Sequence, residues 1–105
     1  INQHGFSANE AARLLSTNAA KKFGIYPRKG VIQLGSDADF TIVDLDEEWI
    51  VDGKKLYYKQ GWSPYDGWKV RCKVDKTIIR GKIAFEDGLI KAERGSGVFI
   101  NPREI

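Results

Sequence analysis

Few residues in this sequence have the types and spacing that catalysis requires. A serine or cysteine hydrolase needs a nucleophile, a base and an orienting group, and His4 is the only histidine. Its place near the first residue predicts a frayed position that is unsuited to precise catalysis. Cys72 is the only cysteine, so this chain alone supplies neither an internal disulfide nor the usual ligand sets of zinc. We therefore assign no catalytic, cofactor-binding or metal-ligating residue here.

Three further features could form a site, and each has a simpler interpretation. Asp37 and Asp39 are spaced to place two carboxylates on one side of an extended segment, as a metal site or an acid/base pair requires. We expect them to cap the turn before an apolar strand. Strand alternation directs Arg71 and Lys73 away from the Cys72 sulfur, which favours a small core residue. The glycines of segment 95–97 lack the spacing of a phosphate loop.

The segment from residue 52 to 68 combines aromatic rings with lysines, as single-stranded nucleic-acid binders do. We favour a packing role, in which the rings bury the underside of a long ordered loop, with Trp62, Tyr65 and Trp68 as its anchors. The sequence therefore predicts no nucleic-acid partner. The residues in question are Lys54, Lys55, Tyr57, Tyr58, Lys59, Trp62, Tyr65, Trp68 and Lys69.

Composition narrows the protein class. The 105 residues include 17 basic and 14 acidic side chains, for a formal charge of +3, and 42% are hydrophobic. This balance is typical of a small globular domain with an ordinary charged surface. No apolar run approaches the length of a membrane span, and the first residues lack a signal-peptide pattern, so we expect a cytoplasmic location and no membrane partner. The sequence lacks methionine, which predicts a fragment of a longer chain.

Hydrophobic periodicity predicts two short helices followed by a β-rich body. Ser7 and Glu10 have the spacing of a capping box at the start of the first helix. The polar run 16–18 is expected to end that helix and begin a second, which stops at Gly24. Residues 40–43 are apolar, which predicts a central buried strand, and the acidic run 44–48 predicts a solvated turn.

The later strands have clearer signals. Val70, Cys72 and Val74 alternate with charged residues, which indicates a strand with one wet face. We expect the pairs 80–81 and 87–88 to form hairpin turns that connect it to strands at 82–85 and 89–91. The tail from 94 to 105 is predicted to be loosely ordered.

Several blocks of sequence, in this order, resemble the cyclic amidohydrolases: dihydroorotases, allantoinases, hydantoinases and dihydropyrimidinases. The blocks are Ser16-Thr17-Asn18-Ala19-Ala20-Lys21-Lys22-Phe23-Gly24, Tyr26-Pro27-Arg28-Lys29-Gly30, Gly35-Ser36-Asp37-Ala38-Asp39-Phe40-Thr41-Ile42-Val43-Asp44, Ser63-Pro64-Tyr65-Asp66-Gly67-Trp68, Ile79-Arg80-Gly81-Lys82 and Glu86-Asp87-Gly88. The resemblance spans nearly the whole chain. It implies a C-terminal part in which residues 1–26 are the last helices of a TIM-type (β/α)8 barrel and residues 27–105 belong to a composite β-sandwich.

The resemblance also implies a function for the parent enzyme. Such enzymes open a cyclic amide ring at a zinc site in the barrel, and none of the ligand motifs lies in this chain. We expect the fragment to be structural and inactive by itself, the parent to form homo-oligomers, and dihydroorotate to be the substrate ahead of allantoin, dihydropyrimidines and hydantoins. A noncatalytic binding or assembly module with the same architecture is the alternative.

Overall fold

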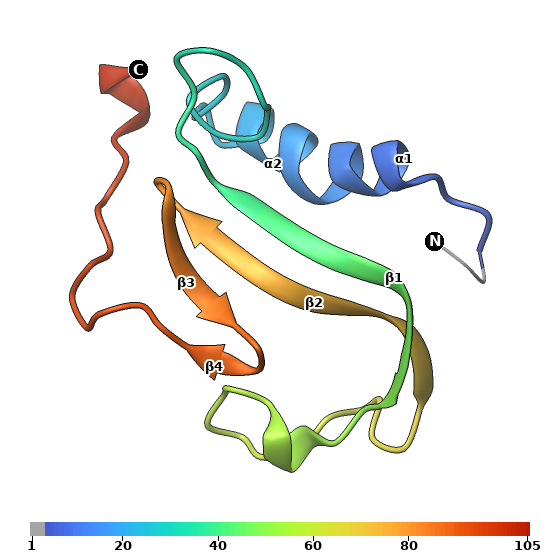
Figure 1. Ribbon diagram of the computed structural model, residues 1–105. Coiled ribbons are helices and arrows are strands. Elements are labelled where there is room, and N and C mark those ends of the chain that lie inside the picture. Colours follow the sequence, from blue (N-terminus) through green and yellow to red (C-terminus); the bar gives the residue numbers. More distant parts are fainter. Residues whose placement is uncertain (1–3) are drawn as a thin grey trace.

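The computed structural model describes residues 4–105, in which one helical segment precedes a four-stranded antiparallel sheet (Figure 1). The helical segment consists of α1 (Ala8–Ala12), the π-helical η1 (Arg13–Thr17) and α2 (Asn18–Lys22). The strands β1 (Phe40–Ile50), β2 (Lys69–Ile79), β3 (Lys82–Glu86) and β4 (Leu89–Ile90) are adjacent in that order. Two 3-10 turns complete the fold, η2 (Gly53–Lys55) and η3 (Pro102–Glu104).

Both ends of the helical segment agree with the sequence prediction. At its start, the Glu10 amide donates to the Ser7 hydroxyl at 3.2 Å, and the Ser7 amide donates to the Glu10 carboxylate at 2.9 Å. This reciprocal capping satisfies two amides that the first turn leaves without partners. At its end, Gly24 adopts a φ of 69°, the left-handed conformation in which many helices stop.

The predicted break between two helices is wrong. Thr17 has helical angles, with φ −62° and ψ −47°, and its side chain caps no amide. Its hydroxyl instead donates to the carbonyl of Gly30 at 2.7 Å. A polar side chain that finds a partner elsewhere in the fold no longer competes with the helix backbone. The helix therefore continues, and the Asn18 amide bonds the Arg13 carbonyl five residues back.

The two hairpins also agree with prediction. Arg80 and Gly81 have φ values of 48° and 76°, and Asp87 and Gly88 have φ values of 51° and 75°. Positive φ at both central positions is typical of the two-residue turns that match the twist of paired strands. The turns join β2 to β3 and β3 to β4, with pairs such as Phe85 opposite Ile90.

Strand β1 differs from its prediction in two ways. It lies at an edge of the sheet and most of its residues are exposed, because residues 4–105 supply no strand on its outer side. The acidic run 44–48, predicted as a turn, lies inside β1, where the register with β2 shifts between Asp44 and Glu48. The Asp44 carboxylate accepts the amides of Asp46 and Glu47 at 2.8 and 3.1 Å. The run therefore forms a bulge and the strand continues.

Little apolar surface is buried. Ala20 and Val51 are the buried hydrophobic residues of the described chain, with 4% and 8% of their surface exposed. Large apolar side chains such as Leu15, Leu34 and Phe99 are almost fully exposed. Within residues 4–105 the strands form one sheet, so the predicted sandwich stays a prediction. No helix in this range packs against a strand, and none is long and apolar enough to cross a membrane.

Candidate functional site

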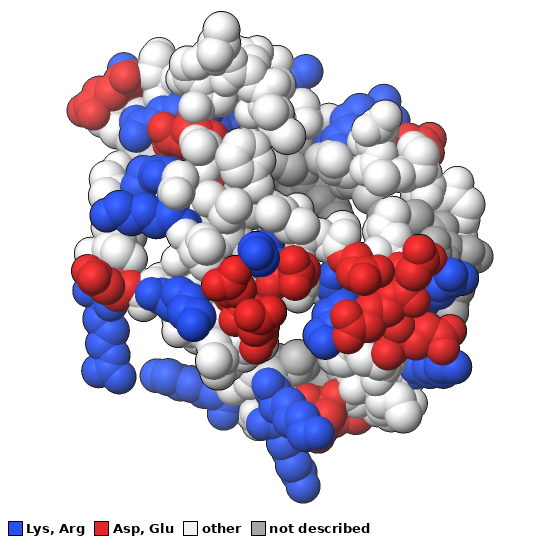
Figure 2. Space-filling model, in the orientation of Figure 1, with Lys and Arg blue, Asp and Glu red and all other residues white. Residues whose placement is uncertain are grey.

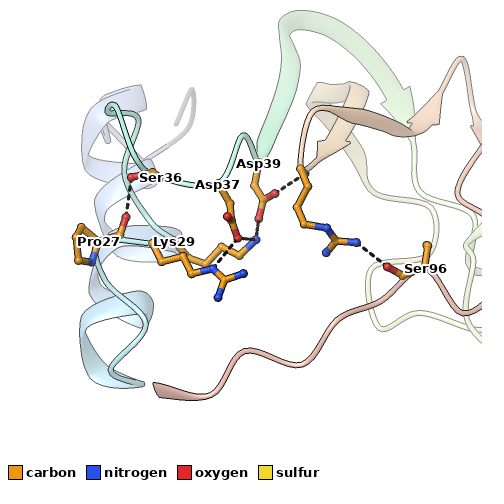
Figure 3. A network of polar contacts seen from close by, with 8 residues as sticks. Pro27, Lys29, Ser36, Asp37, Asp39 and Ser96 are labelled. Atoms are coloured by element: carbon orange, nitrogen blue, oxygen red, sulfur yellow. Dashed lines mark hydrogen bonds and ion pairs between the residues drawn. The ribbon is translucent and has the colours of Figure 1, made fainter. Parts of the chain in front are cut away.

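A network of charged groups gathers where the helical segment, the sheet and the C-terminal tail approach one another (Figure 3). Its members come from the loop that joins α2 to β1 and from the turn between β2 and β3. They are Arg28, Lys29, Asp37, Asp39 and Arg80. We call this set the charged junction.

Lys29 is the centre of the charged junction. Its ammonium group lies 2.9 Å from the Asp37 carboxylate and also contacts the Asp39 carboxylate. The side chain of Lys29 is only 15% exposed, so water competes little with the carboxylates for its ammonium group. Arg28 donates from Nε to Asp37 at 3.1 Å. Two cations and two carboxylates therefore compensate one another within a single loop.

Asp39 connects this loop to the sheet. One carboxylate oxygen contacts Lys29, and the other accepts the backbone amide of Arg80 at 2.7 Å. Beside it, the Gly81 amide donates to the carbonyl of Ala38 at 2.9 Å. Within the loop itself, the Asp37 amide donates to the Arg28 carbonyl at 2.9 Å. The turn between β2 and β3 is thus tied to the loop by two hydrogen bonds.

The charges of the junction stabilise one another. Burial disfavours the charge on Lys29, but hydrogen bonds and attraction from Asp39 and Asp37 together outweigh it and raise the pKa of the ammonium above its ordinary 10.5. The hydrogen bond from Lys29 lowers the pKa of Asp37 below its ordinary 3.8, burial opposes this change, and Arg28 adds to it. Both groups therefore remain charged at neutral pH, which favours a structural ion pair over a role in proton transfer.

The junction modifies what the sequence predicts for Asp37 and Asp39. Their carboxylates bind Lys29, Arg28 and the Arg80 amide, and no group of three or more His, Cys, Asp or Glu side chains suited to a metal occurs in residues 4–105. The expected capping role is correct only in part. Asp39 does accept a backbone amide, but from a turn 41 residues away, and Asp37 binds side chains. The sequence feature that could have predicted these ion pairs is the Arg28-Lys29 dipeptide, which precedes Asp37 and Asp39 in the same short loop.

The other candidate residues lie apart from the junction or contribute only a backbone atom. His4 is exposed at the start of the described chain, and Cys72 is half-buried on β2, not in a core. Ser96 contributes its carbonyl, which accepts from the Arg80 guanidinium at 2.6 Å.

A hollow of about 480 Å³ beside the β1 bulge is lined by three carboxylates and three apolar side chains; its lining residues are Ile42, Val43, Asp44, Leu45, Glu47 and Asp75.

The aromatic loop, residues 52–68, is ordered in a way that the sequence analysis missed. Its rings do not bury its underside, since Trp62, Tyr65 and Trp68 are 61%, 55% and 58% exposed. The loop is held by Asp66, whose carboxylate accepts the amides of Gly53 and Ser63. A carboxylate that binds two amides replaces the hydrophobic anchors that we expected. The rings therefore remain available on the surface of this chain.

Charge on the surface is distributed in small opposite pairs. Acidic side chains lie beside basic ones on the face shown in Figure 2. Across β1 and β2, the carboxylates of the bulge pair with the cations of the neighbouring strand, for example Glu47 with Lys73 at 2.5 Å and Asp46 with Arg71 at 2.7 Å. Such pairs suit strand register better than recognition of a polyanion.

Known amidohydrolases are similar to this chain in both sequence and fold. The sequence pattern of the Amidohydrolase family matches residues 2–84. A dihydroorotase from Pyrococcus furiosus is 41% identical over 93% of this chain and 23% of its own, and an L-hydantoinase from Paenarthrobacter aurescens is 37% identical over 98% and 22%. A solved D-hydantoinase structure superposes with a TM-score of 0.89 at 31% identity, over 94% of this chain and 22% of its own. The chain spans less than a quarter of the length of these relatives.

Proposed function

Because the chain belongs to the amidohydrolase family, we propose that it is the C-terminal part of a cyclic amidohydrolase, an enzyme that hydrolyses the C–N bond of a cyclic amide. The single observation that carries this proposal is the match, in sequence and in fold, to about a fifth of proteins named dihydroorotase and hydantoinase. The large exposed apolar side chains support it, because a sheet and a helix with open apolar faces need a further partner.

The role of this chain within the parent enzyme is structural. The Ser7 hydroxyl donates to the Glu10 carboxylate at 2.8 Å, but this pair caps the start of α1, and the charged junction uses its carboxylates and cations on one another. Residues 4–105 also do not fit a zinc site, since no cluster of metal ligands occurs among them. We therefore assign the zinc that the family resemblance implies, and the reacting groups, to other parts of the parent enzyme.

We further propose that the helical segment belongs to the outer ring of the parent's barrel and that the sheet is one layer of a composite sandwich. The separation of the two parts supports this division, since no described helix packs against a strand. The open outer edge of β1 supports it too, because an edge strand of this length is usually paired or covered in a complete fold. The second layer would come from the rest of the parent chain.

Dihydroorotate is the substrate that we propose first, with allantoin, dihydrouracil and hydantoin as the closest alternatives. The test is ring opening of all four compounds by the zinc-loaded, full-length protein in one parallel panel. Turnover of dihydroorotate alone would support the narrow proposal, and turnover of another ring would keep the reaction but replace the substrate. A folded, zinc-loaded protein that opens none of the four would contradict the proposal and favour the noncatalytic assembly module.

A further inference from the structure

Residues 91–101 form a strap that runs from β4 back toward the end of α2 (Figure 1). At its start, the amides of Lys91 and Ala92 donate to the Ala84 carbonyl at 2.8 and 3.1 Å. At its far end, a Cβ on Gly24 would lie 3.4 Å from the side chain of Pro102. Between these points the strap spans a hollow of about 190 Å³ above the β2–β3 turn and β3.

Arg80, in the turn between β2 and β3, binds the middle of this strap through its side chain. Its guanidinium donates to the Ser96 carbonyl at 2.6 Å, while its own backbone amide donates to Asp39 at 2.7 Å. Figure 3 shows the two partner residues, Asp39 and Ser96, well apart from each other. The left-handed backbone of Arg80, with a φ of 48°, gives the turn the shape in which both partners are reached.

We propose that Arg80 couples the charged junction to the strap, so that the Asp39 carboxylate controls the order of residues 93–97. Asp39 fixes the turn through the Arg80 amide, and the turn fixes the direction from which the guanidinium reaches Ser96. The Arg80 guanidinium is planar and its N–H donors are rigidly arranged, so its single hydrogen bond to the Ser96 carbonyl depends on where the turn places the Arg80 backbone. Loss of the Asp39 side-chain oxygen that accepts the Arg80 amide would therefore release the middle of the strap, although Asp39 itself does not touch it.

Hydrogen exchange of backbone amides in the full-length protein tests this coupling. The reporter is the Ser96 amide, which closes a turn by donating to the Glu93 carbonyl at 3.3 Å. Asp39→Ala removes the acceptor of the Arg80 amide, and we expect about fivefold faster exchange both at that amide and in residues 93–97. Arg80→Gln keeps the Asp39 contact at the backbone, so exchange is expected to rise about fivefold in the strap alone.

Two further variants guard the conclusion. Lys82→Gln removes a cation that lines the same hollow and for which no side-chain partner is found within residues 4–105, so strap exchange should not change. Asp39→Asn keeps an oxygen for the Arg80 amide, so the strap should stay protected in this variant. If Asp39→Ala fails to fold, Arg80→Gln still tests the contact between the guanidinium and the strap. Faster exchange at the Arg80 amide with an unchanged strap, or an unchanged strap in Arg80→Gln, would overturn the coupling.

Discussion

The junction between helix and sheet and the aromatic loop are held together by similar means but differ in what they leave exposed. Both depend on carboxylates that bind amides or cations: Asp37 and Asp39 in the junction, and Asp66 in the loop. Beside the charged junction, Ala20 of α2 is 4% exposed, whereas the loop leaves the ring of Trp62 61% exposed. Polar contacts fix the shape of both regions, and the loop is also closely packed at one point, since Gly53 is buried and a Cβ added there would lie 2.6 Å from backbone atoms of Trp62 and Ser63. The two regions differ in the large rings that only the loop leaves exposed.

This difference indicates which surfaces are complete within the chain. The charged junction has its cations and carboxylates bound to partners within the chain. The aromatic loop has a fixed backbone and open rings, an arrangement that favours a surface prepared for contact with another part of the protein. Five predictions, four on these two regions and one on the β1 bulge, are each measured on the full-length protein.

The largest effect is expected at Gly30. Its φ is 84°, and a Cβ added there would lie 2.5 Å from the Cβ of Ala20 and 3.2 Å from backbone atoms of Ser16 and Thr17. Gly30→Ala should therefore lower the free energy of unfolding by about 3 kcal/mol, measured by denaturant titration.

Gly35→Ala is the matched control for this substitution. Gly35 has a similar φ of 88° but nothing within 4 Å of an added Cβ. Only the conformational cost of about 1 kcal/mol is expected. Equal losses of unfolding free energy in the two variants would show that the close contact between α2 and the loop at Gly30 adds nothing to stability. The contrast between a packed junction and an open aromatic loop would then not hold.

The second effect concerns the aromatic loop. If the Trp62 ring is covered in the full-length protein, as we propose, Trp62→Ala should cost about 2 kcal/mol of unfolding free energy. Light scattering on the same variant tests the homo-oligomer that we propose for the parent enzyme, since loss of assembly would place the ring between subunits. Normal assembly together with unchanged stability would show that the ring is simply exposed to solvent.

The third effect is a change in the pH dependence of stability. The pKa of Asp37 is lowered from 3.8 in the folded protein, so the unfolded state binds the proton more tightly. The stability contributed by Asp37 is therefore present above pH 3.8 and is lost as the pH falls through the folded pKa. Asp37→Asn should cost about 1 kcal/mol at pH 7, and its unfolding free energy should fall less steeply than the wild type's below pH 4.

The alkaline side of the same network has the opposite sign. The pKa of Lys29 is raised above 10.5, so its stabilising contribution is complete below that value and is lost as the pH rises through the folded pKa. Lys29→Gln should therefore flatten the alkaline limb of the stability profile. It should also make the acid limb less steep, because the hydrogen bond from Lys29 is the main cause of the lowered Asp37 pKa. A wild-type profile with neither limb would contradict the paired charges of the junction.

The smallest effect is expected across the β1 bulge. Glu47 and Lys73 form an exposed pair, and such pairs contribute little to stability because water and salt screen them. Glu47→Gln should shift the melting temperature by less than about 1 °C. The hydrogen bond that Lys73 donates to Glu47 raises the pKa of Lys73 above 10.5, so NMR titration should show a lower Lys73 pKa in Glu47→Gln than in the wild type. A larger thermal shift would indicate that the bulge is buried in the full-length protein.

How much of this fold could be predicted depends on the range of the interactions. The capping box at Ser7 and the hairpin turns at Asp87 and Gly88 were predictable because they depend on residues a few positions apart. The continuous helix was not, since Thr17 bonds Gly30 across 13 residues.

The candidate site shows the same limit. The spacing of Asp37 and Asp39 indicates that they act as a pair, but the backbone amide that Asp39 accepts belongs to Arg80, 41 residues away. The role of Asp66 was missed because its ligands, Gly53 and Ser63, are backbone amides that carry no side-chain signal. The edge position of β1 could not be predicted either, because strand order is a property of the assembled sheet.

The bulge in β1 has a consequence for how the chain behaves before its other parts are in place. An open strand edge is a template on which a second copy can add its own strand, which is the first step of fibril growth. In β1 the edge is interrupted by a bulge, and four carboxylates at Asp44, Asp46, Glu47 and Glu48 follow one another there. Two copies that met along this edge would find no straight ladder to extend, because the register shifts at the bulge. The bulge therefore disfavours edge-to-edge pairing of β1 with a second copy.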